Sequence, residues 1–194
     1  MRLNIYGASV AQDTNNIASA VMAASGAAFT LITDEMSDGL AHKIIITPSG
    51  SVTGNYTLAG LDANGHAVSE TLATNTTNAV TSTKHYASGI VVTAPSGLGL
   101  QTVDIGWTAD SVSAMVIPRQ PSHGVFNIGF GCVIADSPTY TVQHTYDGAT
   151  WFNHATVASE TTNQEGSYTS PVQAIRLLWS AAGTVTLTGI QAGA

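Results

Sequence analysis

Apolar and polar residues alternate over many short stretches of the chain beyond Lys43, and a period of two predicts β-strands. Clusters of Gly, Pro, Asn, Asp and Ser separate these stretches at intervals of roughly 8 to 15 residues, which suits antiparallel sandwiches better than alternating strands and helices. The pattern therefore predicts an all-β protein built from antiparallel β-sandwich units of the jelly-roll or immunoglobulin-like kind. The expected strands cover residues 44–46, 56–61, 67–73, 86–93, 101–107, 112–117, 125–134, 139–146, 149–157, 172–179 and 183–190.

Two hairpins are the clearest local signals. Asn64-Gly65 is a dipeptide that supplies the positive φ of a tight turn, and a predicted strand flanks it on each side. Asp147-Gly148 stands in the same relation to the strands expected at 139–146 and 149–157. Each dipeptide predicts two strands that pair antiparallel.

The same strand pattern occurs twice, about 84 residues apart. The strand containing Tyr56 corresponds to the strand containing Tyr140, a turn follows each, and a second tyrosine comes later in each copy, Tyr86 and Tyr168. The repeat predicts two tandem sandwich units, one over 38–110 and one over 111–194 that opens with a hinge. Because the copies share strands and turns but no active-site motif, the repeat favours a structural or binding role over catalysis.

Residues 1–37 differ from the rest of the chain and are expected to form an N-terminal arm. Small apolar residues dominate 16–28, with Ile17 and Val21 at roughly helical spacing, possible caps at Asp13 and Thr14, and Gly26 as a stop. So short and Ala-rich a helix buries little area of its own. A short helix and an extended arm lying against a neighbour both remain open.

Composition limits the partners. Charged residues are 9% of the chain, against about 25% in average soluble proteins, so the surface is polar but largely uncharged. Five scattered basic residues at a net charge of -7 argue against direct binding of nucleic acid, which needs clustered cations. Cys132 is the single cysteine and is expected to be a buried small hydrophobe. No apolar run suits a membrane span or an export signal, so no membrane contact is expected.

No candidate motif predicts catalysis, a metal or a cofactor. The run from Gly7 to Ala11 departs from the nucleophile-elbow pattern and lacks its α/β context. His144 and His154 flank one hairpin turn, but no third ligand can be named. The acidic residues near Asp38 fit no calcium-loop spacing. The chain is therefore expected not to be an enzyme.

Three aromatic residues of the second unit are the candidate contacts for a carbohydrate or another partner. Aromatic rings offer flat faces on which ligands stack. Tyr140 and Tyr146 share one face of a predicted strand, and Trp151 follows the turn. A core or interface role for most aromatic residues is the alternative.

Two segments resemble virion structural proteins encoded in the morphogenesis clusters of tailed bacteriophages. The first is the hairpin Thr57 to Leu72 with the strand that ends at Tyr86, and the second is Tyr140 to Gly148 with Pro171 to Leu177. The resemblance covers most of residues 40–192. The run from Asp147 to Trp151 also resembles discoidin-like carbohydrate-binding sandwiches.

The phage resemblance implies a capsid decoration (cement) or head-spike protein without catalytic residues. It would bind the major capsid protein on the outer surface of the assembled head, form a homodimer or homotrimer, and be made in the host cytoplasm before it joins the virion. A neck or tail adaptor, a fibre component and a carbohydrate-binding module are the alternatives.

Overall fold

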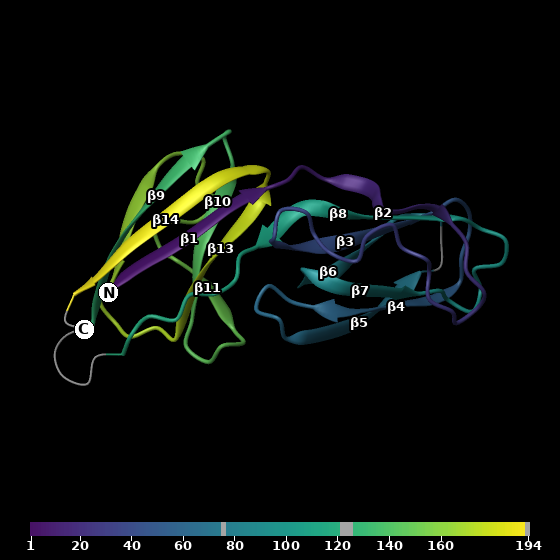
Figure 1. Cartoon of the computed structure of the whole chain (residues 1–194), viewed down its shortest axis with the longest axis horizontal. Coiled ribbons are helices and arrows are strands. Elements are labelled where there is room, and N and C mark those ends of the chain that lie inside the picture. Colours follow the sequence, from purple (N-terminus) through teal and green to yellow (C-terminus); the bar gives the residue numbers. More distant parts are fainter. Residues whose placement is uncertain (75–76, 121–125, 193–194) are drawn as a thin grey trace. The chain divides into compact units, whose positions relative to one another are not determined.

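β-Strands account for almost all the regular structure of the chain. The computed structural model describes residues 1–74, 77–120 and 126–192. These residues form fourteen strands and no helix (Figure 1). The all-β prediction is therefore confirmed. Among the same residues no helix is long and apolar enough to cross a membrane.

The chain divides into two units that are nested rather than consecutive. Met1–Val10 and Val112–Ala194 form one unit, named the terminal unit, and Ala11–Ser111 form the other, named the inserted unit. The sequence suggested a separate arm over 1–37 and two tandem units. In the structure the first ten residues belong instead with the C-terminal part of the chain.

Two packed sheets build the terminal unit. Its strands are β1 (Arg2–Ser9), β9 (Asn127–Ala135), β10 (Thr139–Thr145), β11 (Trp151–Asn153), β12 (Gln164–Tyr168), β13 (Ala174–Ala181) and β14 (Gly183–Ala192). One sheet has four strands in the order β1-β14-β9-β12, and β11, β10 and β13 lie side by side in the other. Neighbouring strands pair antiparallel in both.

The inserted unit has the same two-sheet construction. Its strands are β2 (Asp13–Val21), β3 (Ala41–Pro48), β4 (Gly54–Leu61), β5 (Ala67–Thr74), β6 (Val80–Tyr86), β7 (Ser88–Thr93) and β8 (Val103–Val112). β8, β3 and β6 follow one another in one sheet, β2 pairs with β8, and the other sheet has the order β5-β4-β7. The turn at Asn64-Gly65 joins β4 to β5, as the sequence predicted.

The two units share one topology. The order β2-β8-β3-β6 in the inserted unit corresponds to β1-β14-β9-β12 in the terminal unit, and β5-β4-β7 corresponds to β11-β10-β13. Strand β4 carries Tyr56 and β10 carries Tyr140, so the strands that match in sequence also match in position. The repeat therefore extends to all seven strands of each unit. The first strand of the terminal unit, β1, lies at the start of the chain, whereas its other six strands follow the inserted unit.

The N-terminal segment is extended, not helical. In β1 exposed and buried residues alternate, and Leu3 and Ile5 enter the core. Strand β2 pairs with β8 through two register shifts and buries Ile17 and Ala18 completely. The helix considered for 16–28 was wrong, because these small residues gain more from close packing against a sheet than from a short isolated helix with a costly nucleus.

Large aromatic side chains fill the centres of both sandwiches. Trp179 and Tyr140 are fully buried in the terminal unit, and Tyr56 and Tyr86 are fully buried in the inserted unit. Cys132 is also buried, and burial raises the pKa of its thiol to about 12. The prediction that Cys132 acts as a small hydrophobe is therefore confirmed.

A carboxylate joins the two sheets of the inserted unit where β5 and β6 run past each other. Glu70 of β5 accepts hydrogen bonds from the backbone N–H groups of Thr83 and Lys84 on β6, at 2.9 and 3.2 Å, and from the hydroxyl of Tyr86 at 3.0 Å. Burial alone would raise the pKa of Glu70, but these hydrogen bonds outweigh it and lower the pKa. The ionised side chain thus satisfies strand donors that have no ladder partner.

Three expectations about strands need correction. The strand expected at 112–117 is reduced to the end of β8 and one bridge from Val116 to Ile175. Only Trp151–Asn153 of the stretch 149–157 is a strand, although backbone bonds to β10 continue as far as Glu160. Strand β12 and most of β6 lie where no strand was expected. For the strand expected at 125–134, Val125 lies outside the described residues.

The close contact of β2 with β8 gives a stability test. A Cβ at Gly106 would lie 2.5 Å from the backbone carbon of Thr14. We therefore expect Gly106→Ala to lower the free energy of unfolding by about 1–3 kcal/mol, the usual cost of overpacking, measured by urea denaturation. Gly131→Ala is the matched control, because a Cβ there meets nothing within 4 Å. Equal stability of the two variants would contradict the observed approach of the strands.

Candidate binding surfaces

Tyr140, one of the three aromatic residues expected at a ligand site, belongs to the core. It is fully buried, and its hydroxyl donates a hydrogen bond to the carbonyl oxygen of Thr162 at 3.0 Å. Its counterpart in the repeat, Tyr56, is fully buried as well. Tyr140 is therefore not available to a partner.

The other two expected residues, Trp151 and Tyr146, lie on opposite faces of their sheet. Trp151 pairs with Thr145, and the next residue, Phe152, pairs with His144. Successive side chains of a strand point to opposite faces. Trp151 therefore lies on one face, whereas Phe152, His144 and Tyr146 lie together on the other.

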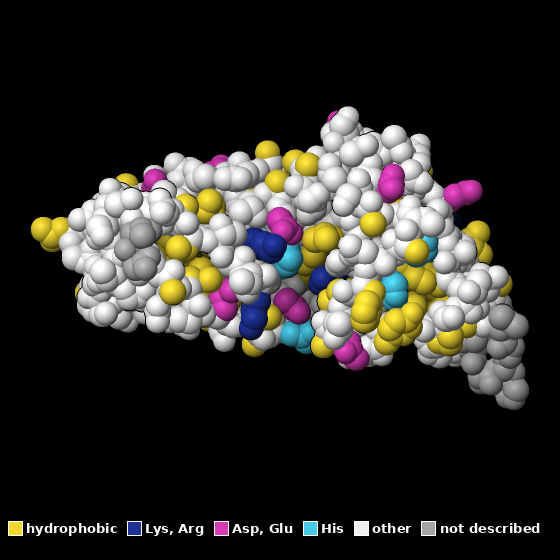
Figure 2. All heavy atoms as spheres, turned by 180° about the vertical axis from the view of Figure 1, so that it is seen from behind, with side chains coloured by type: hydrophobic (Ala, Val, Ile, Leu, Met, Phe, Trp, Pro, Cys, Tyr) yellow, Lys and Arg dark blue, Asp and Glu magenta, His cyan; other side chains and the backbone are white. Residues whose placement is uncertain are grey.

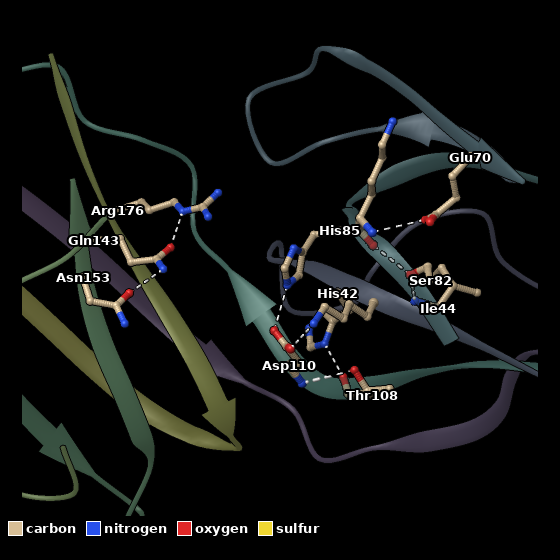
Figure 3. A network of polar contacts seen from close by, with 12 residues as sticks. His42, Ile44, Glu70, Ser82, His85, Thr108, Asp110, Gln143, Asn153 and Arg176 are labelled. Carbon is tan, nitrogen blue, oxygen red and sulfur yellow. Dashed lines mark hydrogen bonds and ion pairs between the residues drawn. The ribbon is translucent and has the colours of Figure 1, made fainter. Parts of the chain in front are cut away.

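The face that carries Trp151 is occupied by contacts within the chain. The guanidinium carbon of Arg176 lies 4.0 Å from the centre of the Trp151 ring. Arg176 also donates through Nε to the amide oxygen of Gln143 at 2.9 Å, and Gln143 donates to Asn153 at 2.9 Å (Figure 3). This row crosses β13, β10 and β11 in register. Its role is to tie three strands together.

The opposite face carries a cluster of aromatic rings where β10 and β12 end. We name it the aromatic end; it consists of His144, Tyr146, Phe152, His154 and Tyr168. Ring centres lie 5.3 Å apart for His144 and Tyr146, and 5.9 Å apart for Tyr146 and Phe152. Tyr146 is 56% exposed and Phe152 is 47% exposed. Figure 2 shows hydrophobic side chains gathered around a histidine on this part of the surface.

Tyr168 supports the exposed rings from the inside. It is buried, and the rings of His144 and His154 meet it edge-on with centres 5.1 and 5.0 Å away. Phe130, also buried, lies behind it at 5.6 Å. A continuous set of ring contacts thus runs from the core to Tyr146 at the surface. Such contacts favour one fixed arrangement of the rings.

Hydrogen bonds fix the orientation of the two histidines. His154 donates through Nε2 to the carbonyl oxygen of Ser167 at 3.2 Å, and its Nδ1 accepts the backbone N–H of Thr156 at 3.3 Å. The hydroxyl of Tyr168 and Nδ1 of His144 share a hydrogen bond at 3.4 Å. Neither imidazole can turn without losing a partner.

The aromatic end carries no charge on His144 or Tyr168 at neutral pH. Burial first, and the charge of His154 second, lower the pKa of His144. Burial first, and the charge of Tyr146 second, raise the pKa of the Tyr168 hydroxyl. Both groups are therefore neutral near pH 7, and the site is suited to an uncharged partner.

Two hollows flank Tyr146. The first has a volume of about 230 Å³ and the second about 320 Å³. Tyr146 lines both, so its ring forms a ridge between them. The first is lined by His144, Tyr146, His154, Ala155, Ser167, Tyr168, Thr169 and Ser170, and the second by Ile117, Gln120, Tyr146, Pro171, Val172 and Gln173. Neither set contains Asp, Glu, Lys or Arg.

A second surface of the terminal unit is the outer face of its four-stranded sheet. Tyr6, Thr186 and Val133 lie opposite one another across β1, β14 and β9. Tyr6 is 65% exposed, Val133 is 61% exposed, and Ile190 farther along β14 is 70% exposed. Between β14 and β12 this face has a groove of about 670 Å³ lined by Gly129, Phe130, Gly131, Glu165, Gly166, Ser167, Thr188 and Ile190.

The equivalent face of the inserted unit is charged. The Lys43 ammonium and the Nε2 atom of His85 lie 2.5 and 2.8 Å from the carboxylate oxygens of Asp110 (Figure 3). Burial would raise the pKa of Asp110, but hydrogen bonds from His85 and Lys43 and their positive charge lower it. These groups satisfy one another, so this face carries a charged cluster that its counterpart lacks.

The acidic cluster weighed as a calcium site does not converge on a common point. Asp38 instead accepts a hydrogen bond from Nε2 of buried His42 at 2.8 Å, and Nδ1 of His42 donates to the carbonyl oxygen of Thr108 at 2.8 Å. Within the described ranges no three His, Cys, Asp or Glu side chains could hold a metal ion. These contacts connect β3 with the preceding loop and β8.

Comparisons with known proteins add little to this geometry. No family model matches the chain, and no curated protein matches it. Among solved structures, an allantoicase from Saccharomyces cerevisiae is similar at 10% identity and a TM-score of 0.25, over 95% of this chain and 90% of the allantoicase. At that TM-score the likeness carries no argument about activity.

The lowered pKa of His144 predicts how the terminal unit responds to acid. An unfolded chain takes up this proton as the pH falls through about 6.5, whereas the folded protein resists it. The stability that depends on neutral His144 is therefore present above about pH 6.5 and is lost below it. We expect His144→Phe to reduce the drop in urea midpoint between about pH 7.5 and about pH 5.5.

Tyr146→Phe is the control for this experiment, because it removes only a hydroxyl from the same cluster. It should keep the drop seen in the wild-type protein. If His144→Phe shows an unchanged drop, burial of the imidazole does not govern the acid response.

Proposed function

We propose that the chain is a structural protein of a tailed-phage virion, a capsid decoration (cement) protein that binds the outer surface of the assembled head. The major capsid protein is its partner. The protein acts by binding, without a cofactor and without catalysis. Its contacts with neighbouring capsid subunits bridge them and hold the shell together.

The resemblance to phage virion proteins lies in segments that are elements of the fold. Thr57 to Leu72 is the β4–β5 hairpin, and Tyr140 to Gly148 is β10 with the turn that follows it. Both segments belong to strands and turns that occur in each of the two units, and neither contains a cluster of catalytic residues. This favours a scaffold whose surfaces, more than any single reactive residue, carry its function.

The outer face of the four-stranded sheet is the observation that carries the proposal. Interface centres are depleted in charged residues and enriched in apolar and aromatic ones. This face exposes Tyr6, Val133 and Ile190, and its ionisable side chains, Arg2 and Glu165, lie on the edge strands β1 and β12. The groove floored by glycine offers space for a protruding segment of the shell.

The size of this face implies many weak contacts rather than one strong contact. Four strands about 4.8 Å apart, paired over about eight residues, give a face of roughly 500 Å². A stable interface typically buries about 800 Å² per partner. We therefore expect the protein to act as a homodimer or homotrimer, because linked copies that bind one lattice gain avidity.

Cement function follows from selective binding. A protein that binds only the assembled, expanded shell stabilises that state by mass action, and the stabilisation grows with the ratio of free protein to the dissociation constant. A surface formed by neighbouring capsid subunits gives this selectivity, because isolated subunits do not present it. In this role the protein is made in the host cytoplasm and then joins the outer surface of the head.

Val133→Asp tests the proposed contact. The change places a charge in the middle of the apolar face, where desolvation of an unpaired carboxylate opposes binding. We expect affinity for expanded capsids to fall by at least about tenfold, measured by co-sedimentation with capsids assembled from the major capsid protein of the same phage.

Val91→Asp is the matched control. Val91 is an exposed strand valine, 45% exposed on β7 of the inserted unit, and its substitution should leave capsid binding unchanged. Wild-type protein that does not bind expanded capsids, or purified virions that lack the chain, would overturn the proposal. Equal loss in the two variants would place the contact elsewhere.

A further inference from the structure

We infer that the aromatic end of the terminal unit is a binding site for a neutral saccharide. It is centred on other residues than the face proposed to contact the capsid, and Ser167 of β12 is the one lining residue, among those described, that its hollows share with the groove of that face. The site is centred on Tyr146, with Phe152 and His144 beside it and a hollow on either side. The inference goes beyond the decoration role, and it stands on contacts of the terminal unit alone.

The exposure of the rings is the first argument. In a chain that buries Trp179 and Tyr140 completely, Tyr146 and Phe152 leave about half of their surface in water, at 56% and 47%. Both belong to one cluster, with ring centres 5.9 Å apart. Exposed aromatic residues that gather in a cluster mark interaction sites more often than single ones do. Their faces suit the C–H surface of a sugar ring.

Rigidity is the second argument. His144 meets Tyr146 edge-on at 5.3 Å, and buried Tyr168 holds His144 from behind. The hydrogen bond between the Tyr168 hydroxyl and His144 fixes this contact. A ring that is already held in place loses little conformational freedom on binding, which matters for weak ligands such as sugars.

The hollows are the third argument. Known ligand pockets span about 300–1,000 Å³. The second hollow, about 320 Å³, reaches the lower end of that range, and the first, about 230 Å³, lies below it. Neither holds more than a small group alone, but both border Tyr146, so a short oligosaccharide that lies across Tyr146 would reach both. Thr169 and Ser170 are among the residues that line one hollow, and Gln120 and Gln173 are among those that line the other, so hydroxyl- and amide-bearing side chains border both. These are the groups that pair with sugar hydroxyls.

Charge selects among possible ligands. Among the described residues, no Asp, Glu, Lys or Arg lines either hollow, and the chain carries a net charge of -7. Acidic glycans would meet no cation among these lining residues and would meet overall repulsion. Nucleic acid would lack phosphate contacts for the same reason, since Arg176 stacks on Trp151 on the opposite face. A neutral saccharide is the class that fits.

The test uses the full-length chain and defined probes. Neutral hexasaccharides of glucose, mannose and xylose with different linkages are titrated by calorimetry, with heparin and polygalacturonate as acidic comparisons. At least one neutral probe should bind, and Tyr146→Ala should weaken that binding by about tenfold or more. Phe152→Ala should weaken it less, and Tyr146→Phe, which keeps the ring, should bind within about threefold of the wild type.

Tyr6→Ala is the matched control, because Tyr6 is also an exposed tyrosine, at 65% against 56% for Tyr146, but lies on the outer face of the four-stranded sheet. It should bind the saccharide as the wild type does. The inference is overturned if no neutral probe binds at millimolar concentration or if only the acidic glycans bind. Peptides that bind at Tyr146, with no binding by any neutral saccharide, would also overturn it. So would an equal loss of saccharide affinity in Tyr6→Ala and Tyr146→Ala.

Capsid binding separates this inference from the decoration proposal. Tyr146→Ala should retain wild-type affinity for expanded capsids, and Val133→Asp should retain wild-type affinity for the saccharide. Loss of saccharide binding alone would leave the capsid contact intact, and loss of capsid binding alone would leave the saccharide site intact. The two ideas can therefore fail independently.

Discussion

The antiparallel ladder between β1 and β14 is the constraint on which the rest of the structure depends. It pairs Arg2 with Ile190 and continues residue by residue to Ser9 and Gly183, so the two ends of the chain lie in one sheet. Without β1, strand β14 would be an open edge with unpaired donors and acceptors. Because β1 belongs to the terminal unit, the inserted unit comes, in the sequence, between the first strand of the terminal unit and its other six strands. The ladder also completes the face that carries Tyr6.

The two units share one arrangement of strands but differ on their surfaces. Each unit has the same order of seven strands, and each keeps a buried tyrosine on its central strand, Tyr56 or Tyr140. The second tyrosine shows the difference. The hydroxyl of Tyr86 donates to the carboxylate of Glu70 and connects two sheets, whereas the hydroxyl of Tyr168 is hydrogen-bonded to His144 behind an exposed cluster of rings. The same arrangement of strands thus carries hydrogen bonds between the two sheets in one unit and a candidate binding site in the other.

The alternation of apolar and polar residues and the turn dipeptides correctly predicted the local parts of the fold. The hairpins around Asn64-Gly65 and Asp147-Gly148 and the all-β class followed from them. Strand β12 and the N-terminal strands were missed, because polar or small residues form strands there only when a neighbouring strand pairs with them. Tyr146 was named from sequence, but Phe152 was not. The register across the turn decides whether Trp151 or Phe152 shares a face with Tyr146, and only the pairing of His144 with Phe152 settles it.

The central claim is that the terminal unit has two working surfaces, a sheet face for the shell and an aromatic end left free for another ligand. A cryo-EM reconstruction of the virion, at a resolution that separates strands, tests it most directly. The account predicts density for this chain on the outer shell, with the β1-β14-β9-β12 face against the major capsid protein and Tyr146 open to solvent. Density that places the aromatic end or the inserted unit on the shell, or no density for the chain, would contradict it.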